Sequence, residues 1–384
     1  MSQPEQLIPA EEVSKEVEFP LSFDEWEQKA ASLMQAGGYG YASSGAGKGE
    51  TAKRNEEAFG KWAIVPRMLS DVSNADMSVS LFGRTYKRPF LLAPIGMQKL
   101  AHPEGELASV RAAAALGIPF VLSTVASHSI EQVAAAAPTG SKWFQLYWSN
   151  NEDVSFSMAE RAENAGYEAI VVTVDTIRTG FRETDIRNQF SPLAKGLGKA
   201  NYESDPAFMN ALKSHDEEAI VTSMLENMQT LSLHWNHIAK LKERTNLPVL
   251  LKGILHPEDA KRALEYGVDG LVVSNHGGRQ LDGTIASIDA LPAIAEAVQK
   301  RVPVLFDSGI RRGTDVIKAL ALGADAVLIG RPFLYGLAAH GQQGIEKVIE
   351  NFTRETEISL SLCGIANLSQ LGMLKMVRDS FGQF

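Results

Sequence analysis

Short apolar runs recur along the chain, each bounded by glycine, proline or polar residues. Eight of them are Phe90–Ala93, Phe120–Leu122, Trp143–Leu146, Ala169–Val172, Val249–Leu251, Leu271–Val273, Val304–Phe306 and Ala326–Ile329. They are rich in Val, Ile and Leu and nearly continuous, rather than alternating apolar and polar. Such runs are typical of parallel strands that are buried on both faces. The pattern therefore predicts eight parallel strands.

Helical patterns separate these strands. They cover residues 104–116, 154–166, 257–267, 290–300 and 314–323, and several end in glycine. Eight strand–helix units over about 250 residues predict an α/β fold, a (β/α)8 TIM barrel. A doubly wound sheet would also alternate, but no G-x-G-x-x-G follows the first strand, and eight units is the barrel count.

Two segments lie outside this repeat. The connection from Thr173 to Pro248 is long, and only Leu233–Arg244 reads as the expected helix. Residues 181–230 are therefore expected to form an insertion after strand four, of the kind that makes a lid or stays disordered. Residues 1–88 are expected to be a preface to the barrel of residues 89–384, with a helix over Phe23–Gln35 capped by Ser22.

The composition narrows the function. The chain has 384 residues and a formal net charge of −9, with 45% hydrophobic and 22% charged residues, as in ordinary globular proteins. No Lys/Arg run tracks a phosphate backbone, which argues against nucleic acid as a partner. The single cysteine, Cys363, excludes an internal disulfide and a Cys-based zinc site, and it favours a reducing compartment.

Neither end of the sequence shows a recognisable targeting signal. Residues 1–13 lack the basic and apolar regions of a signal peptide, and residues 380–384 do not resemble a Ser-Lys-Leu signal. No window approaches the roughly 18–20 apolar residues of a membrane span. We therefore expect a cytoplasmic protein that has no membrane partner.

The strongest motif is Ser274–Gly283, directly after the sixth predicted strand. It reads Ser-Asn-His-Gly-Gly-Arg-Gln-Leu-Asp-Gly, and it places His276 and Arg279 on one turn. Barrel active sites lie at the carboxyl ends of the strands, so this turn offers a base and a cation there. A polar surface turn is the alternative.

The loops after strands seven and eight predict a phosphate site. Residues 306–314 contain Asp307, Gly309 and Arg311, and residues 329–332 contain Gly330 and Arg331. Glycines allow close approach of backbone N–H groups, helix N-termini attract anions, and the arginines add full charges. Ordinary strand–helix turns are the alternative.

Further polar side chains close strands three to five. Gln145 and Tyr147 end strand three, Thr173 and Asp175 end strand four before Arg182, and Lys252 ends strand five. A lysine inside a barrel needs an anionic partner, because burying an unpaired charge is costly. A reduced flavin, anionic at N1–C2=O, would be such a partner.

Two tempting signals point elsewhere. Gly45–Gly49 looks like a phosphate loop, but it does not fit G-x-x-x-x-G-K-[ST] and no strand precedes it. His234 and His237 could share a helix face, but without cysteines or a carboxylate pattern a solvated face is expected rather than a metal site.

These residues resemble the FMN-dependent L-2-hydroxy-acid oxidising enzymes, which include glycolate oxidase, lactate oxidase and lactate monooxygenase. The similarity runs from about Tyr41 to Gly364. It rests on the Ser-Asn-His-Gly-Gly-Arg-Gln motif, on Ala101–Glu106 and on Arg311–Val316. The resemblance implies FMN as the cofactor, a small L-2-hydroxy acid such as L-lactate as the substrate, O2 as the acceptor, and a homotetramer or higher homo-oligomer.

The resemblance also implies residue roles. His276 would be the base, oriented by Asp175; Arg279, Arg182 and Tyr41 would bind the substrate carboxylate, and Tyr147 the hydroxyl or keto oxygen. The implied FMN-binding residues are Ala93, Pro94, Ile95, Gly96, Ser123, Gln145, Thr173, Lys252, Ser274, Asp307, Gly309, Arg311, Gly330 and Arg331.

Some positions depart from glycolate oxidase. Gly96 replaces an alanine, Val125 replaces a tryptophan, and the insertion with Asn201–Tyr202 resembles lactate monooxygenase most. Gly96 would leave room for oxygen beside the flavin, and the insertion would delay escape of the keto acid. An oxidase, a monooxygenase and a dehydrogenase with another acceptor all stay open, as does a non-redox phosphate-binding isomerase. His276 could take either the α-proton or the hydroxyl proton.

Overall fold

The computed structural model describes residues 19–378. The sequence expectations for residues 1–13 and 380–384 therefore lie outside the described residues. Within residues 19–378, no helix is both long and apolar enough to cross a membrane.

Eight parallel strands form a closed barrel at the centre of the molecule, as predicted. They are β4 (Phe90–Leu92), β5 (Phe120–Ser123), β6 (Lys142–Tyr147), β7 (Ile170–Thr173), β8 (Val249–Ile254), β9 (Gly270–Val273), β10 (Val304–Phe306) and β11 (Ala326–Ile329). Neighbours along the chain are neighbours in the barrel, and β11 closes it against β4 through Leu328 opposite Leu91. The TIM-barrel prediction is confirmed.

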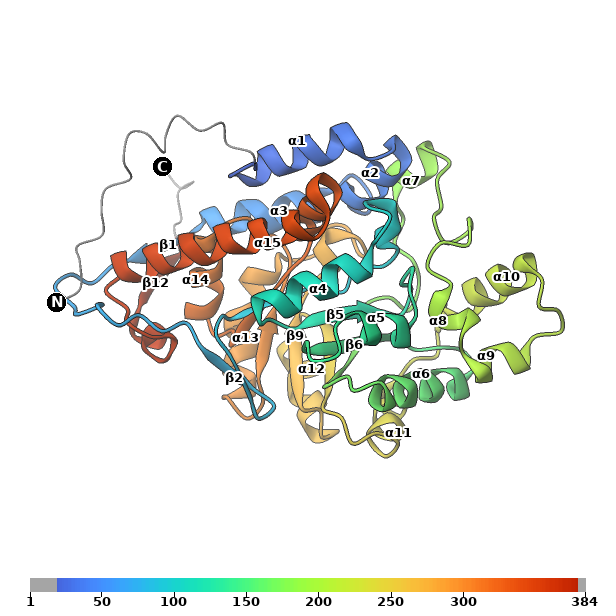
Figure 1. Ribbon diagram of the computed structural model, residues 1–384. Helices are drawn as coiled ribbons and strands as arrows, with labels where there is room; N and C mark the ends of the chain where they lie inside the picture. The colour runs from blue at the N-terminus through green and yellow to red at the C-terminus, as the bar shows by residue number, and fades with distance from the viewer. Residues whose placement is uncertain (1–18, 379–384) are drawn as a thin grey trace.

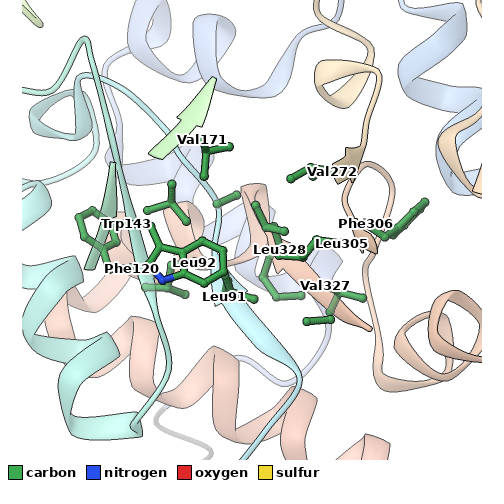
Figure 2. Close-up of a cluster of buried hydrophobic side chains, with 14 of the residues drawn as sticks. Leu91, Leu92, Phe120, Trp143, Val171, Val272, Leu305, Phe306, Val327 and Leu328 are labelled. Atoms are coloured by element: carbon green, nitrogen blue, oxygen red, sulfur yellow. The ribbon is translucent and has the colours of Figure 1, made fainter. Parts of the chain in front are cut away.

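The strands are apolar on both sides because both sides are buried. Figure 2 shows buried side chains of several barrel strands gathered in one cluster, among them Leu91 of β4, Phe120 of β5, Val171 of β7 and Leu328 of β11. All four are at most 2% exposed. This two-sided burial is why the strand runs are continuous in sequence.

Helices surround the barrel in the predicted order. The predicted ones are α4 (Glu106–Leu116), α6 (Glu152–Asn164), α11 (Trp235–Lys242), α12 (Pro257–Glu265), α13 (Ser287–Val298) and α14 (Gly313–Ala321). The sequence analysis did not single out α5 (Ile130–Ala136) or α15 (Arg331–Leu362). The start of α15 at Arg331 matters for the site, because its N-terminus faces the barrel mouth.

The segment before the barrel is mostly helical and packs over one side of it. It contains α1 (Phe23–Leu33), α2 (Ala36–Ser43) and α3 (Glu50–Gly60), then β1 (Trp62–Val65) and the hairpin of β2 (Val79–Leu81) and β3 (Arg84–Tyr86). Ser22 caps α1 as expected, in a capping box with Glu25. Figure 1 shows α1 along α15, and β1 pairs with the late strand β12 (Lys375–Arg378).

The insertion after β7 carries regular structure. It forms four short helices, α7 (Glu183–Arg187), α8 (Ala200–Glu203), α9 (Pro206–Ala211) and α10 (Glu217–Asn227). Asp205 caps α9 and Asp216 caps α10. In Figure 1, α8, α9 and α10 project beside the barrel near α6. Helices of four to six residues, such as α7, α8 and α9, show no readable periodicity. The sequence analysis also missed α10, although its 11 residues are as many as those of α1.

Candidate active site

One cavity opens at the carboxyl ends of the barrel strands, with an empty volume of about 1100 Å³ including its solvent-open part. It gathers most of the residues that the sequence analysis selected. These are Tyr41, Ala93, Pro94, Ile95, Gly96, Tyr147, Arg182, Lys252, His276, Arg279, Asp307, Gly309, Arg311, Gly330 and Arg331. A single cavity thus holds both the candidate base and the candidate phosphate site.

Five selected residues lie behind the cavity wall: Ser123, Gln145, Thr173, Asp175 and Ser274. Three of them form a buried chain across neighbouring strands. The Gln145 side-chain amide donates to Thr173 Oγ1 over 3.0 Å, and its oxygen accepts from Ser123 Oγ over 3.1 Å. Each of the three is at most 2% exposed. Their hydrogen bonds fix the polar floor at the strand ends.

His276 is held on a strained turn after β9. Its φ is +61°, in the left-handed region that non-glycine residues rarely adopt, and its N–H donates to Ser274 Oγ over 3.0 Å. Nδ1 lies 2.9 Å from Asp175 Oδ1, and Nε2 lies 3.5 Å from the Tyr147 hydroxyl. Asp175 therefore orients the ring so that Nε2 is next to the cavity residue Tyr147.

Burial and charge set the protonation states of this pair. Burial lowers the pKa of His276 below its usual value, although Asp175 opposes the shift. Burial alone would raise the pKa of Asp175, but His276 and Lys252 together bring it below its usual value. At neutral pH the pair is thus a neutral imidazole beside a carboxylate. This arrangement can accept a proton at Nε2 and stabilise the imidazolium that forms.

Two arginines and a tyrosine face the cavity beside His276. The Arg279 guanidinium donates to the backbone oxygens of Tyr41 and Ser44 over 2.5 and 2.8 Å. It also lies 4.7 Å from the centroid of the Tyr41 ring, and the Arg182 guanidinium lies 5.5 Å from that centroid. Burial lowers the pKa of Arg279 to about 10, which leaves it protonated at neutral pH.

These two cations lack a full anionic partner among the described residues. The nearest carboxylate to Arg182 is Asp185, at 4.0 Å, and burial raises the pKa of Asp185. Two paired guanidinium groups at a cavity wall favour a carboxylate ligand. The cavity therefore fits a small organic acid next to the His276 base.

Lys252 has its anionic partner within the chain. Its Nζ lies 2.9 Å from Asp307 Oδ2 and donates to Ser274 Oγ over 2.9 Å. The sequence analysis suggested a flavin as the partner, whereas the structure supplies Asp307 as well. The pair is almost fully buried, with exposed side-chain fractions of 5% and 10%. The ammonium still lines the cavity, so it remains available to an electron-rich ligand edge.

The loops after β10 and β11 form the opposite end of the cavity. Arg311 lies there with its Nε buried and without a partner among the described residues, while its Nη2 donates to Glu56 over 2.6 Å. At Gly330, an added Cβ would meet only Ala93, at 3.9 Å, so the backbone leaves open space before α15. An unpartnered arginine N–H, an open glycine and a helix N-terminus fit a terminal phosphate.

Arg331 has a second role beside this end. Its guanidinium donates to the backbone oxygens of Ala42, Ser44 and Gly277 over 3.1, 2.9 and 3.2 Å. It thereby joins the end of α2 to the turn that carries His276. Sequence reasoning selected Arg331 only for phosphate and did not anticipate this link.

Gly96 requires a correction to the sequence interpretation. A Cβ at Gly96 would lie 2.6 Å from Val125 Cγ2 and 2.8 Å from the Val125 oxygen. Alanine would therefore collide with Val125, rather than only take up space meant for oxygen. The glycine is needed for packing between the ends of β4 and β5.

Asp282 explains the glycine-rich segment Gly45–Gly49, and sequence reasoning missed it. Its carboxylate accepts from the backbone N–H groups of Lys48 and Thr51 over 3.0 and 2.8 Å. The aspartate thus occupies the position at the start of α3 that a phosphate takes in a phosphate loop. The only sequence signal was an aspartate within the His276 motif.

The expected solvated helix face is wrong for His237, which is buried in α11 with its ring 5.3 Å from that of Trp148. His234 caps α11, and His237 lies 3.3 Å from Glu152. Over residues 19–378 no three His, Cys, Asp or Glu side chains are grouped to hold a metal ion.

Comparison with known proteins agrees with this site. Residues 30–378 match the FMN-dependent dehydrogenase family. The chain is 54% identical to an L-lactate oxidase of Lysinibacillus sphaericus, covering 96% of this chain and 95% of that one. It is 40% identical to 2-hydroxyacid oxidase 1 of Homo sapiens, covering 91% and 94%. A crystal structure of mandelate oxidase superposes with a TM-score of 0.85 at 38% identity, covering 94% and 99%. The chain is therefore a member of the FMN-dependent dehydrogenase family and an oxidoreductase with FMN as its cofactor.

Proposed function

We propose that this enzyme oxidises small L-2-hydroxy acids, L-lactate above all, to 2-keto acids, with O2 as the final electron acceptor. The observation that carries the proposal is the single cavity shared by His276, Arg182 and Arg279. A base beside two buried cations is what removal of a proton from a bound 2-hydroxy acid requires. The names of the relatives, L-lactate oxidase and 2-hydroxyacid oxidase, support the same substrate class.

The chain binds and aligns the substrate through the residues at the His276 end. Arg279 and Arg182 bind its carboxylate together with the Tyr41 hydroxyl, and the Tyr147 hydroxyl donates to the substrate oxygen. With the carboxylate fixed, the substrate has one orientation relative to Nε2 of His276, which is the positioning effect that makes the step fast. The L configuration is selected because, with the carboxylate and the hydroxyl both held, only one hand presents the α-hydrogen rather than the side chain to the reacting groups.

His276 moves the proton. Nε2 accepts it, from either the α-carbon or the hydroxyl, and the Asp175 carboxylate 2.9 Å from Nδ1 stabilises the resulting imidazolium. Bound FMN supplies the two-electron acceptor that no side chain provides. The ring system of FMN would be held by Lys252, Gln145, Ser123, Thr173 and Ser274. Its ribityl chain would contact Asp307 and Gly309, and its phosphate would contact Arg311, Gly330 and Arg331. The residues at 93–96 would line the ring beside the substrate.

A second candidate is lactate-monooxygenase-like decarboxylation. In that reaction one L-lactate and one O2 give acetate, CO2 and one water, whereas an oxidase gives pyruvate and H2O2. The observation that favours this reaction is that the insertion packs closely against Met97 and Val125 of the cavity wall. At Gly198 an added Cβ would lie 2.8 Å from Met97 Cγ and 2.8 Å from the Val125 oxygen. An insertion packed this closely against the wall would slow escape of the keto acid while peroxide forms.

Product analysis tests the proposal. The holoenzyme is turned over with L-lactate in air, with and without catalase, and acetate, pyruvate and H2O2 are quantified. Peroxide and pyruvate equal to the lactate consumed identify an oxidase, and dominant acetate identifies a monooxygenase. Turnover only with an added artificial acceptor, and none with O2, would instead identify a dehydrogenase. No consumption of any 2-hydroxy acid would return the phosphate-binding isomerase to consideration.

We also propose that the protein works in the cytoplasm as a homotetramer or larger homo-oligomer. Exposed large apolar side chains, among them Met68 at 67% and Leu69 at 105% exposure, support association. Analytical ultracentrifugation tests it, and a monomer at micromolar concentration would contradict it.

A further inference from the structure

Val125 lies at the substrate end of the cavity. Ser123 pairs with Gln145 between β5 and β6, and just beyond this pair the Thr124 hydroxyl accepts the Tyr147 N–H over 2.9 Å, which brings the residue before Val125 next to Tyr147. Tyr147 is the residue whose hydroxyl lies 3.5 Å from His276 Nε2. Both Val125 and Tyr147 line the cavity. Val125 is therefore next to the place where the substrate carbon skeleton must lie.

Val125 is held tightly between two glycines. On one side an added Cβ at Gly96 would lie 2.6 Å from Val125 Cγ2, and on the other an added Cβ at Gly198 would lie 3.2 Å from Val125 Cβ. The Val125 oxygen also accepts the Met97 N–H over 2.9 Å. Neither neighbour has a side chain that could swing away. Val125 has no room to retreat while Gly198 stays in place.

Asn201 fixes Gly198 and the end of β5 to each other. Its side-chain amide donates to the backbone oxygens of Ser123 and Thr124 over 3.2 and 3.0 Å, and its oxygen accepts the Ile130 N–H over 2.8 Å. The residue is fully buried, at 0% exposure. One amide thus uses both its donors and its acceptor to join the insertion to the β5–α5 connection.

A buried ion pair supports this junction from behind. Arg161 of α6 lies 3.0 Å from Asp205, the cap of α9, and donates to the backbone oxygen of Asn201 over 2.9 Å. The Asp205 side chain is fully buried and that of Arg161 is 13% exposed. Residues 198–205 are therefore part of the rigid wall rather than a segment that swings open.

We propose that Asn201 is a positioning residue for substrate selection. By holding residues 123 and 124 against the insertion it fixes Val125 between Gly96 and Gly198, and this fixed wall rejects 2-hydroxy acids with aromatic side chains. The inference rests on the proposed function and adds the buried amide that keeps larger side chains out. The sequence resemblance named Val125 and, separately, Asn201 as part of the insertion, whereas the structure shows that the Asn201 amide joins the insertion to the residues before Val125.

The test compares kcat/KM for L-lactate with kcat/KM for L-mandelate, in FMN-loaded wild type, Asn201→Ala, Val125→Ala and the double variant. The lactate-to-mandelate ratio should fall by about 10-fold or more in each single variant, the scale that a hydrophobic pocket achieves per small group. In the double variant this ratio should fall by less than the product of the two single-variant factors, because both changes loosen the same part of the cavity wall. Asn227→Ala is the matched control: Asn227 joins the insertion to Ser149 and does not line the cavity.

The control should keep the wild-type ratio. A general loss of structure would lower both kcat/KM values and leave their ratio unchanged, so an unchanged ratio in folded, FMN-loaded Asn201→Ala overturns the inference. Fully multiplicative effects in the double variant overturn it too, since Asn201 would then not act through Val125. If Asn201→Ala does not fold, Val125→Ala still tests the inference. An unchanged lactate-to-mandelate ratio in Val125→Ala would show that Val125 does not exclude aromatic substrates, which overturns the inference. A wild-type flavin that no L-2-hydroxy acid reduces would refute the proposed function instead.

Discussion

The carboxylate of Asp282 accepts the backbone N–H of Thr51 over 2.8 Å and so ties the N-terminus of α3 to the turn that carries His276 and Arg279. A second bond within the same junction runs from the Ala46 N–H to the Gly278 oxygen over 2.8 Å. These contacts hold the segment after Tyr41 against the cavity. The proposed substrate clamp, formed by Tyr41, Arg182 and Arg279, therefore depends on Asp282, which does not line the cavity.

Replacing Asp282 with alanine should weaken both the fold and the clamp. The N-cap residue of α3 is Gly49, which has no side chain, so Asp282 supplies the capping oxygens from a distant turn. Loss of such a cap should cost about 1 kcal/mol of unfolding free energy. The loosened Tyr41 segment should raise KM for L-lactate several-fold with a smaller change in kcat. Urea unfolding and steady-state kinetics measure the two effects. Asp216→Ala is the control, because Asp216 caps α10 through the Ala219 N–H away from the cavity. An equal rise in KM in both variants would contradict the account.

His276→Gln should leave FMN bound and slow flavin reduction by a factor on the order of 10²–10⁴, as loss of a general base does. Anaerobic rapid mixing with L-lactate measures the reduction rate directly. Retained yellow colour after gel filtration is the check that the cofactor site is intact. A wild-type reduction rate in this variant would remove His276 from its role.

The pH dependence of kcat/KM should report the same base. Only the neutral imidazole accepts a proton, so activity is lost as pH falls through the His276 pKa, which burial places below the usual 6.5. In Asp175→Asn the anion that favours the imidazolium is gone. The acid limb should therefore move to still lower pH while the maximal rate falls. An acid limb above 6.5 in wild type, or a shift upward in the variant, would contradict this assignment.

The barrel and most of the site could be predicted from the sequence because their signals are local. Continuous apolar runs mark strands buried on both faces, and polar residues directly after them mark the barrel mouth. The role of Asn201 could not be predicted, because its partners Ser123 and Thr124 lie far away in sequence. The same holds for Asp282 and Thr51. Pairings between distant segments leave no periodic trace in the chain.

The anionic partner of Lys252 shows the same limit. Its burial at a strand end predicted that some anion must be near, yet nothing local identified Asp307, which is two strands further along the barrel. For Gly96 the neighbour was known but the geometry was not. The sequence analysis named Val125, yet a sequence cannot show that a methyl group at position 96 would point toward Val125.

Breaking the Lys252–Asp307 pair should be costly. Lys252→Met leaves a buried carboxylate without its cation, a change that typically costs about 3–5 kcal/mol. Lys252→Met combined with Asp307→Asn should cost less than the sum of the two single changes, because no uncompensated charge remains. Urea unfolding of the three FMN-loaded variants measures this. Additive losses would mean that the 2.9 Å contact contributes no coupling.

The central claim is that the cavity binds FMN and a small L-2-hydroxy acid side by side, with His276 as the base. The most direct test is anaerobic mixing of the purified yellow protein with L-lactate or D-lactate, followed by flavin absorbance and pyruvate assay. L-lactate should bleach the flavin with one pyruvate formed per flavin, and D-lactate should leave it oxidised. A flavin that stays oxidised with L-lactate and with other short L-2-hydroxy acids, or equal bleaching by both enantiomers, would contradict this claim.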